Sequence, residues 1–221
     1  MSAPAIKICG ISTSAALDAA LKARADYVGL VFFAKSPRNV SITQATALAR
    51  QAGAAARVVG LFVDPADDFL DAVRAAVPLD VIQLHGNERP EQAARWRRHS
   101  GLEVWKAIGV RQRADLDAAR AYAGAADRVL FDAKPPRDAA WPGGHGLPFD
   151  WRLLQSLSLE KPWLLAGGLR TTNLQAAVAL TRAPIVDVSS GVESRPGIKD
   201  PEKLEAFFAA ARRIDAAAVD A

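Results

Sequence analysis

Short β-rich segments alternate with amphipathic helical segments along the whole chain, and this alternation constrains the fold more than any other feature. Apolar residues in the helical segments recur every three or four positions, as at Phe69, Val73 and Val77, which is the pattern of a helix with one buried face. Parallel strands need a crossover connection, and a helix supplies it. The chain is therefore predicted to form a parallel sheet. The eight predicted strands are Ala5–Cys9, Tyr27–Phe33, Arg57–Val63, Asp80–Leu84, Glu103–Ile108, Arg128–Asp132, Pro162–Ala166 and Ile185–Val188.

Eight strand–helix units in 221 residues leave about 27 residues per unit, and eight such units close most naturally into a barrel. An open, doubly wound sheet is the competing α/β fold, but it usually carries a glycine-rich dinucleotide loop after an early strand. The segment after the first strand, Cys9-Gly10-Ile11-Ser12, lacks that pattern. We therefore predict a single (β/α)8 TIM barrel, with residues 1–221 as one domain. Helices are expected to begin near Ser12 or Thr13, Thr43, Asp67, Pro90, Asp150, Thr171 or Thr172, and Pro201.

Charge and hydropathy argue against nucleic-acid and membrane partners. The 28 Lys and Arg residues exceed the 24 Asp and Glu residues by only four, and the two signs are interleaved. The one dense basic run, Arg95–Arg98, is predicted to be a solvated helix face. The longest apolar run, Tyr27–Ala34, falls far short of the roughly 20 residues that a membrane span requires. A small anionic ligand is the partner that suits this mildly basic chain.

The single cysteine, Cys9, excludes an internal disulfide and indicates a reducing compartment. The first residues lack the basic start and the apolar stretch of a secretory signal. A cytoplasmic location is therefore expected.

In a barrel of this type the active site lies where the strands end and lead into the helices. The pairs Gly167-Gly168 and Ser190-Gly191 follow the seventh and eighth strands, which is the common phosphate site of the fold. Small residues there let backbone N–H groups approach an anion. Taken singly, each pair could merely permit a tight turn, but together they predict a phosphate-binding site.

Two further strand ends carry groups suited to acid–base chemistry, namely Cys9 and Asp132. Either one alone could be structural, Cys9 as a small buried apolar residue and Asp132 as a turn or cap. Their presence on one ring of strand ends favours a general acid and base pair. Since side chains alternate along a strand, Lys7 should lie beneath Cys9 inside the barrel. A buried ammonium needs a partner, and we predict that Asp187 on the neighbouring strand supplies it.

The remaining polar residues near the strand ends leave alternatives open. Arg38 is either a solvated arginine or a bidentate clamp for a substrate carboxylate. His85 either holds its loop or takes part in the site, whereas His99 and His145 are expected to be non-catalytic. No metal-ligand spacing, Ser-His-Asp order or phosphate-binding P-loop occurs, so no metal or nucleotide is expected.

The chain resembles the phosphoribosylanthranilate isomerase family of tryptophan biosynthesis from its first strand to its last helix. Glycine pairs are common in phosphosugar barrels, whereas the cysteine-bearing segment together with Ser-Ser-Gly-Val-Glu is highly specific. The matching segments are Lys7–Gly10, Gly29–Phe33 with Lys35–Arg38, Gln83–Glu88, Leu130–Lys134, Phe149–Trp151, Leu165–Leu169, Asp187–Glu193 and Pro196–Asp200.

The resemblance implies an Amadori rearrangement of N-(5′-phosphoribosyl)anthranilate without a cofactor. By similarity, Asp132 is the general acid that opens the sugar ring, and Cys9 is the general base that removes the C2′ proton. Arg38 would hold the anthranilate carboxylate. The resemblance places the other substrate-binding positions at Gln83, His85, Gly167, Gly168, Asp187, Ser190 and Gly191.

These roles carry electrostatic expectations. A thiol needs a small downward shift of its pKa to act as a base near neutrality, whereas an aspartic acid needs burial or a nearby anion to stay protonated. The chain departs from the family pattern at Gly143–Gly146, where a small hydroxyl residue is expected, and at Arg170, where the family usually has an Asn-Pro-like turn. These departures concern loop contacts and substrate affinity.

Three other functions compete with this interpretation. A histidine-pathway isomerase would be expected to use two carboxylates, but the first strand here ends in Cys9. Indole-glycerol-phosphate synthase relies on a lysine and glutamate set and has a longer N-terminus. A barrel that binds a phosphate ligand without catalysis is the third alternative. The sequence does not decide between a monomer and a homodimer.

Overall fold

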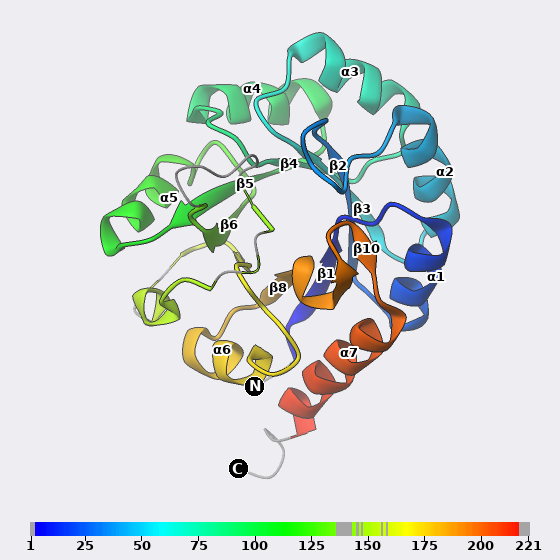
Figure 1. Ribbon diagram of the computed structural model, residues 1–221. Coiled ribbons are helices and arrows are strands. Elements are labelled where there is room, and N and C mark those ends of the chain that lie inside the picture. Colours follow the sequence, from blue (N-terminus) through cyan, green and yellow to red (C-terminus); the bar gives the residue numbers. More distant parts are fainter. Residues whose placement is uncertain are drawn as a thin grey trace.

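Eight parallel strands, each hydrogen-bonded to the next, close into a barrel in the computed structural model (Figure 1). The structure describes residues 3–135, 143, 144, 146, 148–155, 157 and 159–216. Strand β8 pairs with β1, with Lys7 beside Asp187 in the register, and this pairing closes the ring. The predicted (β/α)8 barrel is confirmed. The strands are β1 Ala5–Cys9, β2 Tyr27–Phe32, β3 Arg57–Phe62, β4 Val81–Leu84, β5 Glu103–Val110, β6 Arg128–Ala133, β7 Leu164–Leu165 and β8 Ile185–Val188.

Helices surround the barrel, and α7 packs beside α1 so that the last helix completes the ring (Figure 1). The predicted helix starts at Asp67, Pro90 and Pro201 are confirmed. The α-helices are α1 Ser14–Lys22, α2 Ile42–Ala52, α3 Asp67–Ala76, α4 Pro90–Ser100, α5 Asp117–Ala121, α6 Leu174–Thr181 and α7 Pro201–Ala216, and the short 3-10 helices are η1 Arg113–Leu116, η2 Trp151–Leu154 and η3 Ser190–Val192.

Two predicted helix starts are corrected. The segment that begins at Asp150 forms only the 3-10 turn η2, which Asp150 caps by accepting a hydrogen bond from the Arg152 N–H at 3.0 Å. Helix α6 begins at Leu174 rather than at Thr171 or Thr172. The reason is local: Asn173 Oδ1 accepts the Arg170 N–H at 2.7 Å and closes a turn across those two threonines.

A short antiparallel hairpin, β9 Glu193–Arg195 with β10 Ile198–Lys199, follows strand β8 and was not predicted. It lies over the barrel next to β1 (Figure 1). Glu193 and Lys199 are both buried, although the hairpin itself is near the surface. The hairpin therefore carries two charged side chains toward the interior of the protein.

Alternate residues of each strand point into the barrel, as the parity of a strand requires. Ala5 of β1 packs against an interior apolar cluster that includes Trp105, and Cys9 packs with Val31 and Leu61 in a second cluster. Lys7 lies between these two positions on the same face of β1. Lys7 is therefore a charged residue enclosed between two apolar clusters inside the barrel.

The basic run on α4 is exposed, as predicted, and it also joins neighbouring elements through ion pairs. Arg95 pairs with Asp67 at 2.6 Å and Arg97 with Asp127 at 2.8 Å. These pairs neutralise much of the positive charge of the run. In the described part of the chain, no helix has the length and apolar character that crossing a membrane demands.

Candidate active site

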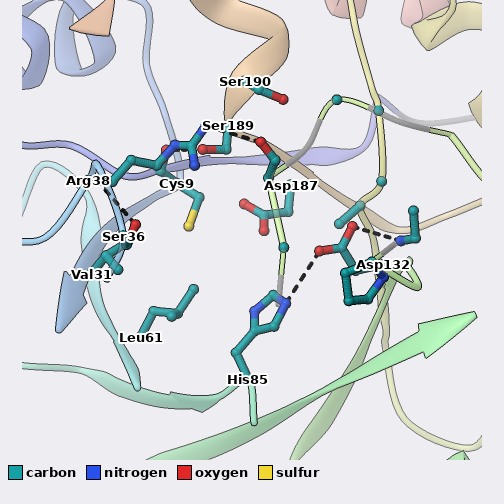
Figure 2. Close-up of a pocket in the computed structure, with 18 of the residues that line it drawn as sticks. Cys9, Val31, Ser36, Arg38, Leu61, His85, Asp132, Asp187, Ser189 and Ser190 are labelled. Carbon is teal, nitrogen blue, oxygen red and sulfur yellow. Dashed lines mark hydrogen bonds and ion pairs between the residues drawn. The ribbon is translucent and has the colours of Figure 1, made fainter. Parts of the chain in front are cut away.

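A pocket opens at the carboxyl ends of the strands and has a volume of about 820 Å³, its open mouth included. Cys9 from β1 and Asp132 from β6 both line it, and both residues are buried. In Figure 2 their side chains reach toward the pocket from opposite sides. The structure therefore brings the two predicted acid–base residues into one cavity.

Beneath Cys9, a buried ion pair holds the centre of the barrel. Lys7 Nζ donates to Asp187 Oδ1 at 2.9 Å, which confirms the predicted pairing of these two residues. Gly29 on β2 provides the necessary space, because a Cβ there would lie 3.1 Å from Cys9 Sγ and 3.2 Å from Lys7 Nζ. The Cys9 thiol and the Lys7 ammonium group therefore both pack against Gly29.

Burial and charge act in opposite directions on these two groups. Burial by itself lowers the pKa of Lys7, but the Asp187 carboxylate and Cys9 outweigh it, and the net pKa of Lys7 is raised. Burial raises the pKa of the Cys9 thiol, and the nearby Lys7 ammonium only partly opposes this. The expected downward shift of the Cys9 pKa is thus wrong for the ligand-free protein, because desolvation of the thiolate outweighs the attraction of the ammonium.

Titration of Cys9 tests this electrostatic account directly. Since Cys9 is the only thiol in the chain, thiolate absorbance and alkylation rate report on it alone. We expect a midpoint above that of an ordinary cysteine, and a further increase in the Lys7→Met variant, which lacks the ammonium. A midpoint below the ordinary value in the wild-type protein would contradict the account.

Asp132 accepts one backbone hydrogen bond and lies against the ring of His85. Its Oδ1 accepts the Ala133 N–H at 2.8 Å, and its Oδ2 lies 3.3 Å from His85 Nε2 (Figure 2). On the other side of the ring, His85 Nδ1 lies 3.1 Å from Gln83 Nε2. His85 lines the pocket, whereas Gln83 is fully buried beneath it and is not among the lining residues.

Arg38 is buried rather than solvated, and its guanidinium lines the pocket. Its Nε and Nη2 donate to the two carboxylate oxygens of Glu193, each at 2.8 Å, and Nη2 also donates to Gly144 O at 3.2 Å. Lys199 Nζ donates to the same carboxylate at 2.7 Å. Burial by itself raises the pKa of Glu193, but these two cations outweigh it and the net pKa is lowered.

The hairpin thus fixes the position of Arg38. Sequence reasoning gave Glu193 and Lys199 no role, although both fall in the segments that resemble the family. A signal was present, since a glutamate and a lysine lie six positions apart around the Pro196-Gly197 turn. Their burial, however, depends on where the hairpin packs.

Gly167, Gly168 and Ser190 also line the pocket. Both glycines have positive φ, 80° and 69°, a conformation that other residues rarely adopt. Gly191 is not among the lining residues, but it packs against the Leu169 carbonyl so closely that a Cβ would collide with it. His145 lies outside the described residues, and within those residues no group of three His, Cys, Asp or Glu side chains could hold a metal ion.

The closed barrel and the pocket at its strand ends, lined by Cys9 and Asp132, define the chain as a (β/α)8-barrel enzyme. The model of the N-(5′-phosphoribosyl)anthranilate (PRA) isomerase family matches residues 6–210. The chain belongs to this family of isomerases.

Individual relatives agree with this assignment. The N-(5′-phosphoribosyl)anthranilate isomerases of Paracoccus denitrificans and Rhodospirillum centenum are 56% and 55% identical to the chain, covering 95% of it and 97% and 98% of their own lengths. The crystal structure of the Thermotoga maritima enzyme superposes with a TM-score of 0.85 at 32% identity, covering 95% of this chain and 99% of that one. A PRA isomerase solved in complex with reduced 1-(o-carboxyphenylamino)-1-deoxyribulose 5-phosphate gives 0.82 at 30% identity, with the same coverage.

Proposed function

We propose that the protein catalyses the Amadori rearrangement of N-(5′-phosphoribosyl)anthranilate to 1-(2-carboxyphenylamino)-1-deoxyribulose 5-phosphate by general acid–base catalysis. One observation carries the proposal: the chain's only thiol and the Asp132 carboxyl group line the same pocket. Membership of the PRA isomerase family supports this substrate. The two groups account for the proton transfers of the first two steps.

In the first step, Asp132 donates its proton to the furanose ring oxygen as the C1′–O bond breaks. The anthranilate nitrogen lone pair forms the C1′=N bond, which leaves a positively charged iminium. Cys9 then removes the C2′ proton, and the C–H electron pair forms a C1′=C2′ bond that neutralises the nitrogen. The resulting enolamine tautomerises to the ketoamine.

The raised pKa of Cys9 suggests why the steps follow this order. Burial keeps the thiol protonated in the free protein, so Cys9 must release its own proton to solvent before it can take the C2′ proton. An iminium close by would favour this release by stabilising the thiolate, since an opposite charge lowers the pKa of an acid. Ring opening would therefore generate both the acidic C2′ proton and the conditions under which Cys9 acts as a base.

Arg38 is assigned to the anthranilate carboxylate, and the backbone around Gly167, Gly168 and Ser190 to the phosphate. The guanidinium lines the pocket with its orientation fixed by Glu193, which accepts from Nε and Nη2. The substrate carboxylate would therefore be met by Nη1 as a charge-assisted donor. Asp187 lines the floor of the pocket while it is paired with Lys7. These assignments give each anionic end of the substrate its own partner in the pocket that Cys9 and Asp132 line.

Substitution of Arg38 tests the carboxylate assignment. We expect Arg38→Ala to raise KM by about 10- to 100-fold, because this is the usual effect of losing one hydrogen-bonded charge pair. The effect on kcat should be smaller. Arg38→Lys, which keeps the charge but loses the fork, should fall in between. Arg98→Ala, an exposed arginine of α4, is the matched control. A lower kcat at unchanged KM would contradict this assignment.

Anthranilate fluorescence tests the activity itself. The purified protein should convert many equivalents of substrate, seen as a continuous loss of the substrate's fluorescence, without added metal or nucleotide. A change that saturates at one equivalent of protein would identify a binding protein instead and would overturn the proposal.

A further inference from the structure

Gln83 and His85 form a chain of contacts that ends on Asp132. In the orientation that the Gln83 amide has in the structure, its Nε2 faces His85 Nδ1 at 3.1 Å. An amide N–H can only donate, so in this orientation Nδ1 accepts the hydrogen bond through its lone pair. The neutral ring then carries its proton on Nε2, which faces Asp132 Oδ2 at 3.3 Å. Because Gln83 is fully buried and does not line the pocket, its effect on the site acts through His85.

The loop that carries His85 is held independently of the pocket. Lys106 Nζ donates to Gly86 O at 2.7 Å and to Glu88 Oε2 at 3.0 Å. Glu88 Oε2 also accepts the Gly86 N–H at 2.9 Å, and Glu88 Oε1 accepts the Asp64 N–H at 2.8 Å. The backbone directly after His85 is therefore fixed through both its N–H and its carbonyl, as suits a side chain that must hold one orientation.

Gly143 closes over the contact between His85 and Asp132. A Cβ at this position would lie 2.7 Å from Asp132 Oδ2 and 2.8 Å from His85 Nε2. Any larger residue would therefore press on the two atoms that form the contact. This provides a steric reason for glycine at position 143, within the segment Gly143–Gly146 where the family pattern suggested a small hydroxyl residue.

We infer that Gln83 and His85 are positioning residues for Asp132: Gln83 holds the His85 ring as the Nε2–H tautomer, and this N–H fixes one oxygen of the Asp132 carboxyl group. The Ala133 N–H fixes the other oxygen. The inference rests on the proposed function, in which Asp132 is the general acid. It replaces the substrate-binding roles that the sequence suggested for Gln83 and His85.

The tautomer of His85 can be measured without any substrate. The chain has three histidines, so the double variant His99→Gln with His145→Gln leaves His85 alone in a ¹⁵N NMR spectrum. We expect Nε2 to be protonated and Nδ1 unprotonated at neutral pH, with this preference lost in Gln83→Leu. A ring protonated on Nδ1 before that substitution would overturn the inference, even if the isomerase activity is present.

Kinetics separate positioning from substrate binding. His85→Leu should lower kcat about 10-fold or more and change KM less than about threefold, because the lost N–H orients the Asp132 carboxyl group and does not bind substrate. His85→Gln keeps an N–H donor and should recover part of kcat. Gln83→Leu should also lower kcat, although Gln83 does not line the pocket and so does not contact substrate. An increase in KM at unchanged kcat in His85→Leu would assign His85 to substrate binding and overturn the inference.

Glycine substitutions provide a test that leaves every polar group in place. Gly143→Ala should lower kcat about 10-fold or more, because the methyl group separates His85 from Asp132. Gly124→Ala is the matched control, since a Cβ there meets nothing within 4 Å. Equal activity of Gly143→Ala and Gly124→Ala would overturn the inference. If the wild-type protein fails to isomerise phosphoribosylanthranilate, the proposed function fails, and the NMR measurement still decides the tautomer.

Discussion

Replacing Cys9 by alanine is expected to lower kcat by at least about 10²- to 10⁴-fold, the usual contribution of a general base. The iminium would still form, because Asp132 is untouched, but no described side chain would replace the thiol at its place above Lys7. Steady-state turnover of phosphoribosylanthranilate, followed by its fluorescence, measures the effect.

Two controls make the Cys9 result interpretable. Thermal unfolding should show that the variant remains folded, since alanine removes only one sulfur atom from a small apolar cluster with Val31 and Leu61. Cys9→Ser, which keeps the shape but replaces the thiol by a much weaker acid, should also be strongly impaired. Near-normal turnover in Cys9→Ala would refute the assignment of Cys9 as the base.

Replacing Asp132 by asparagine is expected to lower kcat by a similar factor of at least about 10²–10⁴, because ring opening would lose its proton donor. The amide oxygen can still accept the Ala133 N–H that now holds the carboxyl group. Substrate binding should therefore change less than kcat, and KM measured in the same assay checks this.

Asp132→Glu is the informative companion variant. It retains a carboxyl group but moves it by one methylene, so it should recover part of the activity that Asp132→Asn loses. If Asp132→Asn turns over at the wild-type rate, Asp132 is not the general acid. An unchanged kcat with a greatly raised KM would instead assign Asp132 to binding.

The barrel could be predicted because its signals are local. Strand β1, for example, was predicted with both of its boundaries, since a short apolar run such as Ala5–Cys9 is bounded by turn residues. Strand parity also predicted that Lys7 meets Asp187, because the period of two along a strand and the closure of the ring determine which side chains face each other.

What could not be predicted depends on contacts between distant segments. The partners of Arg38 are Glu193 and Gly144, which lie 155 and 106 residues away in the sequence. The direction of the Cys9 pKa shift was also missed, because it depends on how deeply the thiol is buried against one ammonium group. Neither burial nor such pairing can be read from spacing along the chain.

Cleavage of the C2′–H bond tests the central claim most directly. Phosphoribosylanthranilate carrying deuterium at C2′ is incubated with the wild-type protein and with Cys9→Ala, and loss of the label from C2′ is followed by NMR or mass spectrometry. The account predicts rapid loss with the wild-type protein and loss slower by at least about 10² with Cys9→Ala. Equal rates of C2′–D cleavage in the two proteins would contradict it.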